Sequence, residues 1–194
     1  MDPVSLLQGK SDTCGDLVKI GIITVSDRAS RGEYEDEGGP AILDFLSEAV
    51  ASPVEVHYQC VADELPLIKN ELIRLTDVVG CSVIVTTGGT GPAARDVTPD
   101  ATMAVCDRIL DGFGEQMRTI SLEYVPTAIL SRQLGGTRGS SLIFNLPGRP
   151  KAIRETIDKI WQAVPYCVDL LNGPYMDMVD SVCQAFRPKG TNRR

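Results

Sequence analysis

A glycine-rich run followed by a lone carboxylate is the part of the chain best suited to chemistry. Residues 86–92 read TTGGTGP, and Asp96 follows them. The apolar run at 82–87 is rich in β-branched residues and predicts a buried strand before the glycines. Thr98, as an N-cap, and Pro99, at the first helical position, predict a helix after them. A strand, a glycine turn and a helix N-terminus in this order favour the binding of an anion such as phosphate.

A carboxylate next to a phosphate site indicates a cation between the two anions. Asp63 follows a predicted strand at 54–61, as Asp96 follows the strand at 82–87. Mg²⁺ is commonly bound by one or two carboxylates together with substrate phosphates. We therefore expect Asp63 and Asp96 to be its ligands. The spacing alone is equally compatible with Asp63 as the N-cap of a helix expected at 64–78.

Several familiar chemistries are excluded by the residues around these motifs. No Gly-Lys-Ser/Thr follows the glycines, and their spacing differs from the dinucleotide-binding fingerprint. The six cysteines contain no Cys-x-x-Cys pair, which argues against a zinc ribbon or a redox dithiol. The single histidine, His57, lies in the predicted strand at 54–61 without a nucleophile motif nearby, and we expect it to be a structural surface residue.

The charge balance restricts the partners of the protein. A net charge of −7, from 19 basic and 26 acidic residues, argues against a nucleic-acid-binding face. No targeting signal and no apolar stretch of membrane-spanning length are present, so we expect a cytoplasmic protein with no membrane partner. Positive charge for an anionic ligand must then be local, and arginines stand beside the predicted loops at Arg28, Arg31, Arg95, Arg132, Arg138 and Arg149.

The order of the predicted elements indicates one α/β domain with a largely parallel sheet flanked by helices on both faces. We expect a flexible N-terminus at 1–17, the domain at 18–188 and a basic tail at 189–194. Strands are expected at 18–25, 54–61, 82–87 and 141–146, and helices at 39–50, 64–78, 98–110, 114–123, 126–134 and 150–171.

Ligands of such sheets bind outside the carboxyl ends of the strands. Four predicted strands end in polar or glycine-rich segments, and we expect these segments to meet in one crevice. The residues expected to bind nucleotide or phosphate there are Ser26, Gly88, Gly89, Thr90, Gly91, Asn145, Pro147 and Gly148.

Five segments, in order, resemble one known family. The chain is similar to molybdenum-cofactor biosynthesis proteins, and among them to the bacterial molybdopterin adenylyltransferases. The similarity covers residues 18–188 and implies a fold of the molybdopterin-binding-domain type. The segments are ITVSDRAS at 23–30, TGGTGP at 87–92, RDVTPDAT at 95–102, PTAILSR at 126–132 and LPG at 146–148.

The resemblance implies a reaction and roles for particular residues. Such enzymes transfer AMP from ATP to the terminal phosphate of molybdopterin, release pyrophosphate and require Mg²⁺. Asp63 and Asp96 match the catalytic aspartates, whereas Ser121, Ser131 and Arg132 match residues on the pterin side. Members are typically homotrimers, and a molybdate-inserting enzyme uses their product.

Two other functions are compatible with the same fold. One is a non-catalytic molybdopterin-binding carrier or scaffold, against which the presence of both aspartates argues. The other is a molybdate-inserting enzyme, whose relatives usually carry further domains. The chain also has Ala94 where some family members carry a second basic residue, which removes one expected phosphate contact.

Overall fold

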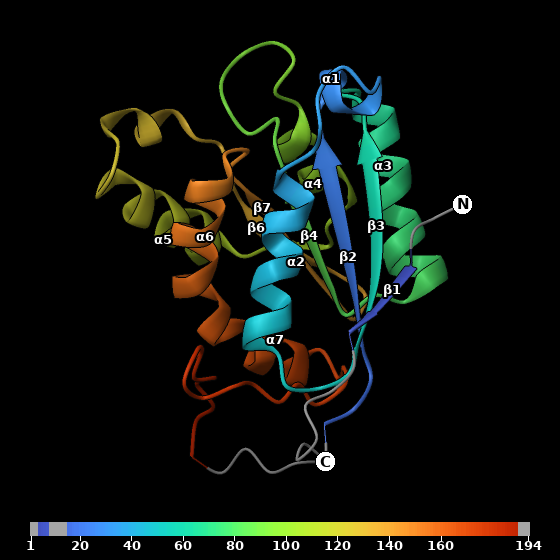
Figure 1. Ribbon diagram of the computed structural model, residues 1–194, viewed down its shortest axis with the longest axis vertical. Coiled ribbons are helices and arrows are strands. Elements are labelled where there is room, and N and C mark those ends of the chain that lie inside the picture. The colour runs from blue at the N-terminus through green and yellow to red at the C-terminus, as the bar shows by residue number, and fades with distance from the viewer. Residues whose placement is uncertain (1–3, 8–14, 190–194) are drawn as a thin grey trace.

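A computed structural model describes residues 4–7 and 15–189 of the chain as a sheet covered by helices (Figure 1). The described strands form one sheet in the order β1-β3-β2-β4-β7-β6-β5. Its four central strands run parallel to one another. They are β2 (Val18–Val25), β3 (Val54–Val61), β4 (Val83–Thr87) and β7 (Ser141–Leu146). The largely parallel α/β fold expected from the sequence is therefore confirmed.

Short antiparallel strands complete both edges of the sheet. On one side, β1 (Val4–Leu7) pairs with β3. On the other, β6 (Gly135–Arg138) pairs with β7, and β5 (Arg108–Ile109) pairs with β6. The β1 strand corrects the expectation of a loose N-terminus at 1–17, of which residues 1–3 and 8–14 lie outside the described part, as do residues 190–194 of the expected tail.

Helices cover both faces of the sheet, and each face has its own apolar core (Figure 1). The larger core lies under α2 (Gly38–Ala49), α5 (Asp111–Leu122) and α6 (Pro150–Ile160). The smaller core lies under α3 (Leu65–Ile73) and α4 (Thr98–Val105). Among the described residues, no helix combines the length and apolar character that crossing a membrane requires.

Alternating side chains of the central strands supply both cores. In β2, Ile20 and Ile22 point into the larger core, whereas Ile23 and Val25 point into the smaller one. A parallel strand buried on both faces needs apolar residues at nearly every position, which explains the unbroken apolar runs of the sequence. The larger core is centred on Trp161, whose ring meets those of Phe45 and Phe144 edge to face, at centroid distances of 5.3 and 6.1 Å.

The expected bounds agree with the structure best for the central strands and less well for the helices. The helix expected at 64–78 is α3 followed by a π-helical turn, η1 (Arg74–Val79), which ends at Gly80 with a φ of 74°. The helix expected at 98–110 ends at Val105, because β5 follows. The helix expected at 126–134 is a 3-10 segment, η2 (Pro126–Leu130). The long helix expected at 150–171 is divided into α6, η3 (Trp161–Ala163) and α7 (Val164–Leu170).

The sequence does not predict the strand β6, because two glycines begin it. Glycine is depleted in strands, and β6 starts with Gly135 and Gly136. Both positions are crowded: a Cβ on Gly135 would lie 2.7 Å from Phe113 Cβ, and one on Gly136 would lie 2.7 Å from the Arg108 carbonyl oxygen. Close packing, rather than propensity, therefore selects the residues of this strand.

The histidine is structural, as expected, but it is not on the surface. His57 is buried in β3, and its Nε2 lies 2.7 Å from Glu55 Oε1 on the same face of the strand. The edge strand β1, which the sequence did not reveal, pairs with this part of β3.

The register of the parallel strands brings their carboxyl ends level. Val25 of β2 is opposite Val61 of β3, and Thr24 is opposite Thr87 of β4. Thr87 is in turn opposite Leu146 of β7. The four segments that follow these strands therefore leave the sheet at one edge, as the sequence predicted.

Burial in the larger core should make Leu46 important for stability. Replacing Leu46, fully buried on α2, with alanine leaves a cavity and should lower the free energy of unfolding by about 2–5 kcal/mol. The same change at Leu67, 48% exposed on α3, should cost less than about 1 kcal/mol. Denaturant unfolding measures both variants, and equal losses would contradict this assignment of the core.

Candidate active site

The glycine loop after β4 closely approaches the protein's own oxygen atoms. Gly88 and Gly89 have φ values of 93° and 61°, which side chains disfavour. A Cβ on Gly88 would lie 2.3 Å from the Val25 carbonyl oxygen. A Cβ on Gly89 would lie 3.0 Å from Asp63 Oδ1, and one on Gly91 would lie 2.7 Å from Asp96 Oδ2. The glycines therefore make room for the two carboxylates that the sequence singled out.

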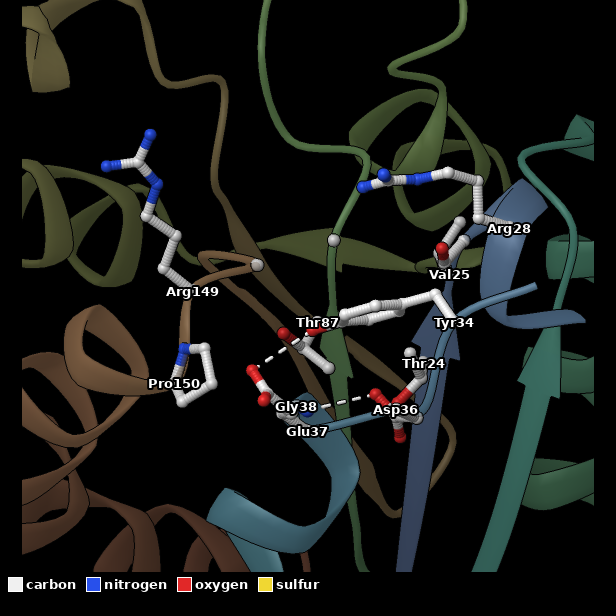
Figure 2. A pocket seen from close by; sticks show the side chains of 13 residues that line it. Thr24, Val25, Arg28, Tyr34, Asp36, Glu37, Gly38, Thr87, Arg149 and Pro150 are labelled. Carbon is white, nitrogen blue, oxygen red and sulfur yellow. Dashed lines mark hydrogen bonds between the residues drawn. The ribbon is translucent and has the colours of Figure 1, made fainter. Parts of the chain in front are cut away.

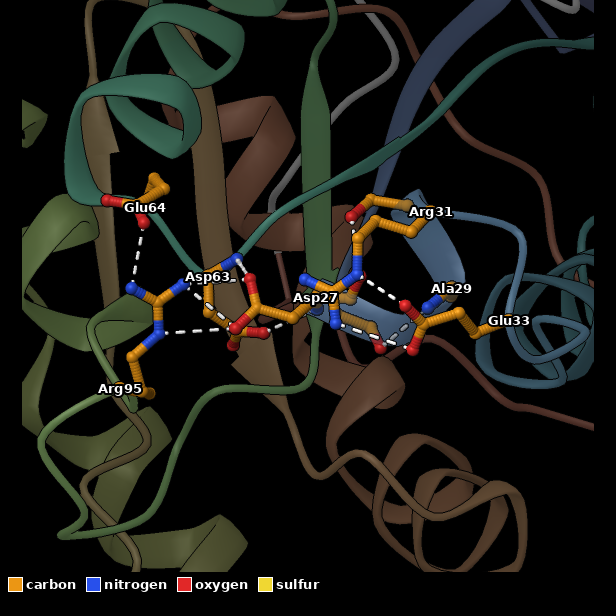
Figure 3. A network of polar contacts seen from close by, with 9 residues as sticks. Asp27, Ala29, Arg31, Glu33, Asp63, Glu64 and Arg95 are labelled. Carbon is orange, nitrogen blue, oxygen red and sulfur yellow. Dashed lines mark hydrogen bonds and ion pairs between the residues drawn. The ribbon is translucent and has the colours of Figure 1, made fainter.

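Asp63 is joined to Asp27 by a reciprocal pair of hydrogen bonds (Figure 3). The backbone N–H of Asp27 donates to Asp63 Oδ2 at 2.7 Å, and the backbone N–H of Asp63 donates to Asp27 Oδ1 at 3.1 Å. Asp27 opens the short helix α1 (Asp27–Ser30), whose N-cap is Ser26. These bonds join the loops after β2 and β3. The alternative of Asp63 as a helix N-cap is wrong, because the N-cap of α3 is Glu64.

Arg95 binds the outer side of this pair. Its Nη2 lies 2.8 Å from both carboxylate oxygens of Asp27, and its Nη1 lies 2.7 Å from Glu64 Oε1. The arginine follows β4, so loops from three neighbouring strands meet in one network (Figure 3).

The surroundings shift the pKa values of the two aspartates in opposite directions. Burial raises the pKa of Asp63, and the negative charges of Asp27 and Asp96 raise it further, against the hydrogen bond from Asp27 and the charge of Arg95. The hydrogen bond from Arg95 lowers the pKa of Asp27. Asp63 faces Gly89 and Asp96 faces Gly91, so both predicted catalytic carboxylates border the same glycine loop.

Asp96 is held by its own loop. Its Oδ2 accepts the N–H of Ala93 at 2.9 Å, and its N–H donates to the Ala93 carbonyl at the same distance. Within the described ranges, no group of three or more histidine, cysteine, aspartate or glutamate side chains could hold a metal ion. Any cation here would thus depend on two carboxylates together with ligands from substrate or water.

The start of α4 differs from the prediction. Val97, not Thr98, is the N-cap residue, and no side chain caps the helix. The Thr98 hydroxyl donates instead to the Gly88 carbonyl at 2.9 Å, and the Thr98 N–H lies 3.2 Å from the Gly89 carbonyl. Pro99 has no N–H to offer. The beginning of α4 therefore holds the glycine loop in place, which leaves fewer amides for an anion than the sequence suggested.

A pocket of about 360 Å³ opens beside the glycine loop (Figure 2). Of the residues predicted to bind phosphate, Ser26, Gly88 and Gly148 line it. Arg28 and Arg149 stand at its rim on opposite sides. The pocket therefore holds two of the arginines expected near an anionic ligand, together with the acidic residues Asp36 and Glu37.

The floor of the pocket joins β4 to β7. The Thr87 hydroxyl donates to the Pro147 carbonyl at 2.7 Å. A Cβ on Gly148 would lie 3.3 Å from Gly88 Cα, so the two loops are in backbone contact. Asn145 lies deeper: it is fully buried, and its amide donates to the Thr86 and Thr102 hydroxyls at 2.9 Å each. Asn145 thus supports the loops from below.

The residues predicted for the pterin side occupy two places. The Arg132 N–H donates to the Thr90 carbonyl at 2.9 Å, and its guanidinium pairs with Asp100, so this segment borders the glycine loop. Ser131 donates to the Gln133 side chain at 2.8 Å. Ser121 lies in the last turn of α5. Binding of pterin by these residues stays a prediction.

The other arginines have different surroundings. Arg31 pairs with Glu33 in the exposed segment after α1. Arg138 pairs with Asp77. This pair lies at the amino ends of the parallel strands, because β6 runs antiparallel to β7 and Arg138 is opposite Ser141, the first residue of β7. Arg138 is therefore not beside the candidate active site, contrary to expectation.

Sequence reasoning missed the acidic residue at the bottom of the pocket. Asp36 accepts hydrogen bonds from the Thr24 hydroxyl at 2.8 Å and from the Tyr58 hydroxyl at 2.5 Å. The N–H groups of Gly38 and Gly39, at the start of α2, donate to it as well. An aspartate two residues before a glycine pair at a predicted helix start was the available signal.

Comparisons with known proteins agree with this geometry. Residues 21–166 match the family model described as "Probable molybdopterin binding domain". The chain is 56% identical to the molybdopterin adenylyltransferase of Helicobacter pylori strain J99, over 89% of this chain and 98% of that protein. It is 50% identical to the molybdopterin adenylyltransferase of Escherichia coli K12, over 91% and 96%.

A solved structure has the same fold. The molybdopterin biosynthesis enzyme MoaB of Thermus thermophilus matches with a TM-score of 0.75 and 41% identity, over 81% of this chain and 99% of that one. The chain therefore belongs to the molybdopterin-binding-domain family. Among its members, the two relatives above that match it along nearly their whole length are molybdopterin adenylyltransferases.

The glycine loop provides a direct test of the geometry. In Gly88→Ala, the new Cβ would meet the Val25 carbonyl while φ stays in the left-handed region, so the loop must move or strain. We expect a loss of about 1–3 kcal/mol in the free energy of unfolding. Gly112→Ala, where nothing lies within 4 Å of the new methyl, is the matched control and should be neutral or stabilising. Equal effects in denaturant unfolding would refute the strained loop.

The raised pKa of Asp63 sets the sign of a second test. The folded protein holds this proton more tightly than the unfolded chain, so the contribution of Asp63 to stability falls as pH rises from 3.8 through the raised pKa. At pH 7 the ionised carboxylate therefore opposes folding. We expect Asp63→Asn to raise the melting temperature at pH 7, with a gain that shrinks as the pH approaches 3.8.

Asp77→Asn is the matched control, because it should act in the opposite direction. The hydrogen bond from Arg138 lowers the pKa of Asp77, so its stabilisation is present above 3.8 and lost as pH falls through the lowered value. Its removal should lower the melting temperature at pH 7. A lower melting temperature in both variants would show that the ionised Asp63 carboxylate does not destabilise the folded protein at pH 7.

Proposed function

We propose that the protein transfers AMP from ATP to the terminal phosphate of molybdopterin and releases pyrophosphate. The reaction would take place where the loops after β2, β3, β4 and β7 meet. The protein is then a nucleotidyltransferase of molybdenum-cofactor biosynthesis. The observation that carries the proposal is the approach of Asp63 and Asp96, from the loops after β3 and β4, to one glycine loop. It occurs in a chain that is 50–56% identical to proteins named molybdopterin adenylyltransferase.

The reaction needs positioning and charge neutralisation more than proton transfer. An oxygen of the molybdopterin phosphate forms a bond to the α-phosphorus of ATP, and the bond from that phosphorus to the pyrophosphate oxygen breaks. The attacking oxygen already carries negative charge, so no strong base is required. This agrees with a site built without the single histidine, which is buried in β3. Two polyanions must instead be held together against their repulsion.

Cationic side chains at the pocket support the binding of phosphate groups. Arg28, on α1, and Arg149, the N-cap residue of α6, both line the pocket (Figure 2). Arg28 also stacks over the Tyr34 ring, with 5.5 Å between the guanidinium carbon and the ring centroid. The acidic lining residues have partners of their own: Asp36 accepts four hydrogen bonds from neutral neighbours, and Glu37 accepts one from the Tyr34 hydroxyl at 3.1 Å.

The donor set fits Mg²⁺. Both Asp63 and Asp96 use Oδ2 to accept a backbone N–H, so the second oxygen of each carboxylate is the one to offer a cation. Carboxylate oxygens are the ligands that Mg²⁺ prefers, together with substrate phosphates and water. When bound, the ion supplies charge neutralisation for the phosphates. Asp63 and Asp96 would hold it, and their loop contacts fix where they do so.

Further properties of the enzyme rest on the family alone. Pterin contacts from Ser121, Ser131 and Arg132, assembly into a homotrimer, delivery of product to a molybdate-inserting enzyme and a cytoplasmic location are proposals of this kind.

A discharge assay tests the proposed reaction. Purified protein is incubated with molybdopterin, ATP and Mg²⁺, and the adenylylated pterin is measured by mass spectrometry. Asp96→Asn should lower kcat about 100-fold or more, because the cation that would neutralise the reacting phosphates loses a charged ligand, while the affinity for molybdopterin stays within about threefold. Asp77→Asn, at the far edge of the sheet, is the control and should keep full activity. Tight pterin binding without product at any metal concentration would favour the carrier function.

A further inference from the structure

Arg95 occupies an unusual position in the proposed site. It follows β4, contacts Asp27 after β2 and contacts Glu64 after β3, so one side chain spans three strand-end loops (Figure 3). Like Asp63 and Asp96, it is not among the residues that line the 360 Å³ pocket. An arginine that joins the loops on either side of a carboxylate is placed to organise those loops.

We propose that Arg95 is a positioning residue for AMP transfer: it fixes the carboxylate of Asp27, and Asp27 fixes the carboxylate of Asp63 against the glycine loop. The inference rests on the proposed function, in which Asp63 is catalytic.

The contacts form a continuous chain from Arg95 to Asp63. The guanidinium reaches both oxygens of Asp27, at 2.8 Å from Nη2 to each and 3.2 Å from Nε to Oδ2, which fixes the plane of that carboxylate. Asp27 Oδ1 then accepts the N–H of Asp63, and Asp63 Oδ2 accepts the N–H of Asp27. These reciprocal bonds leave Asp63 Oδ1 turned toward Gly89.

Electrostatics explain why a cation is needed at this place. Asp27, Asp63 and Asp96 bring three carboxylates to neighbouring loops. Like charges would separate the loops unless a cation offset them. Arg95 supplies that charge and, unlike lysine, binds both oxygens of one carboxylate in a rigid fork.

The exposure of the network indicates that its role is geometry rather than folding. The side chains of Arg95 and Glu64 are 55% and 51% exposed. Ion pairs this open to solvent contribute little to stability. Removing the arginine should therefore leave the fold intact and disturb the position of Asp63.

The decisive experiment compares kinetics and hydrogen exchange in Arg95→Ala. We expect kcat for adenylylated molybdopterin to fall about 10- to 100-fold, as for a misplaced catalytic group, while KM for molybdopterin stays within about twofold. The melting temperature should stay within about 2 °C of the wild type. The backbone amides of Asp27 and Asp63 should exchange faster, because their reciprocal bonds loosen. Unchanged kcat and unchanged exchange would overturn the proposal.

Companion variants separate positioning from general damage. Arg95→Lys keeps the charge without the fork and should recover only part of kcat. Glu64→Gln removes the other partner of Arg95 and should keep kcat within about threefold of the wild type. Arg138→Ala breaks a comparable forked pair, with Asp77 at the opposite edge, and should retain full activity. An equal loss of kcat in these three variants and in Arg95→Ala would overturn the proposal.

A double-mutant cycle tests whether Arg95 acts through Asp27. If it does, Arg95→Ala combined with Asp27→Ala should be no slower than the slower single variant, because both remove the same restraint. Losses that multiply would overturn this route. A wild-type enzyme that forms no adenylylated pterin would refute the proposed function itself, whereas an active wild type with an equally active Arg95→Ala would refute only the positioning role.

Discussion

The pairing register of four parallel strands is the constraint on which the rest of the structure depends. Because β2, β3, β4 and β7 end level with one another, the loops that follow them share one edge of the sheet. Side chains of β2, β4 and β7 are buried on both faces, so a slip of one residue in these strands would exchange the side chains of the two cores. The cores thus fix the register, and the register places the loops that carry the chemistry.

At this edge the protein concentrates negative charge that folding alone would avoid. Asp63 is partly desolvated beside two further carboxylates, and its pKa is raised as a result. Backbone N–H groups and one arginine hold the arrangement together. Perturbed groups of this kind gather at functional sites because binding and catalysis, rather than stability, select them. The same edge carries Arg28 and Arg149, whose positive charge the proposed binding of phosphate groups requires.

The sequence predicted the central architecture because periodicity and β-branched runs report burial directly. It predicted β2, β3 and β7 with their observed bounds and placed the glycine loop beside Asp63 and Asp96. It failed where tertiary contacts override propensity. The glycine-started strand β6, the edge strand β1 and the divided C-terminal helix all depend on what packs against them.

Within the site, the limits of prediction have the same cause. Residue types indicated which carboxylates matter, but not that Asp27 and Asp63 exchange hydrogen bonds, since the two are far apart in the chain. Thr98 has the chemistry of an N-cap and is used instead to hold the glycine loop. Arg95 and Arg138 look equivalent in the sequence, yet only strand direction decides which one reaches the site.

The backbone contact between Gly148 and Gly88 has a mechanical consequence. The two loops touch without intervening side chains, and the Thr87–Pro147 hydrogen bond fastens them from below. They therefore behave as one stiff floor rather than as two independent flaps. A ligand that pushes on one loop transmits the force to the other and, through Thr98, to the start of α4. We therefore expect the pocket to adapt to a ligand on its other side, in the segments that carry Arg28 and Tyr34.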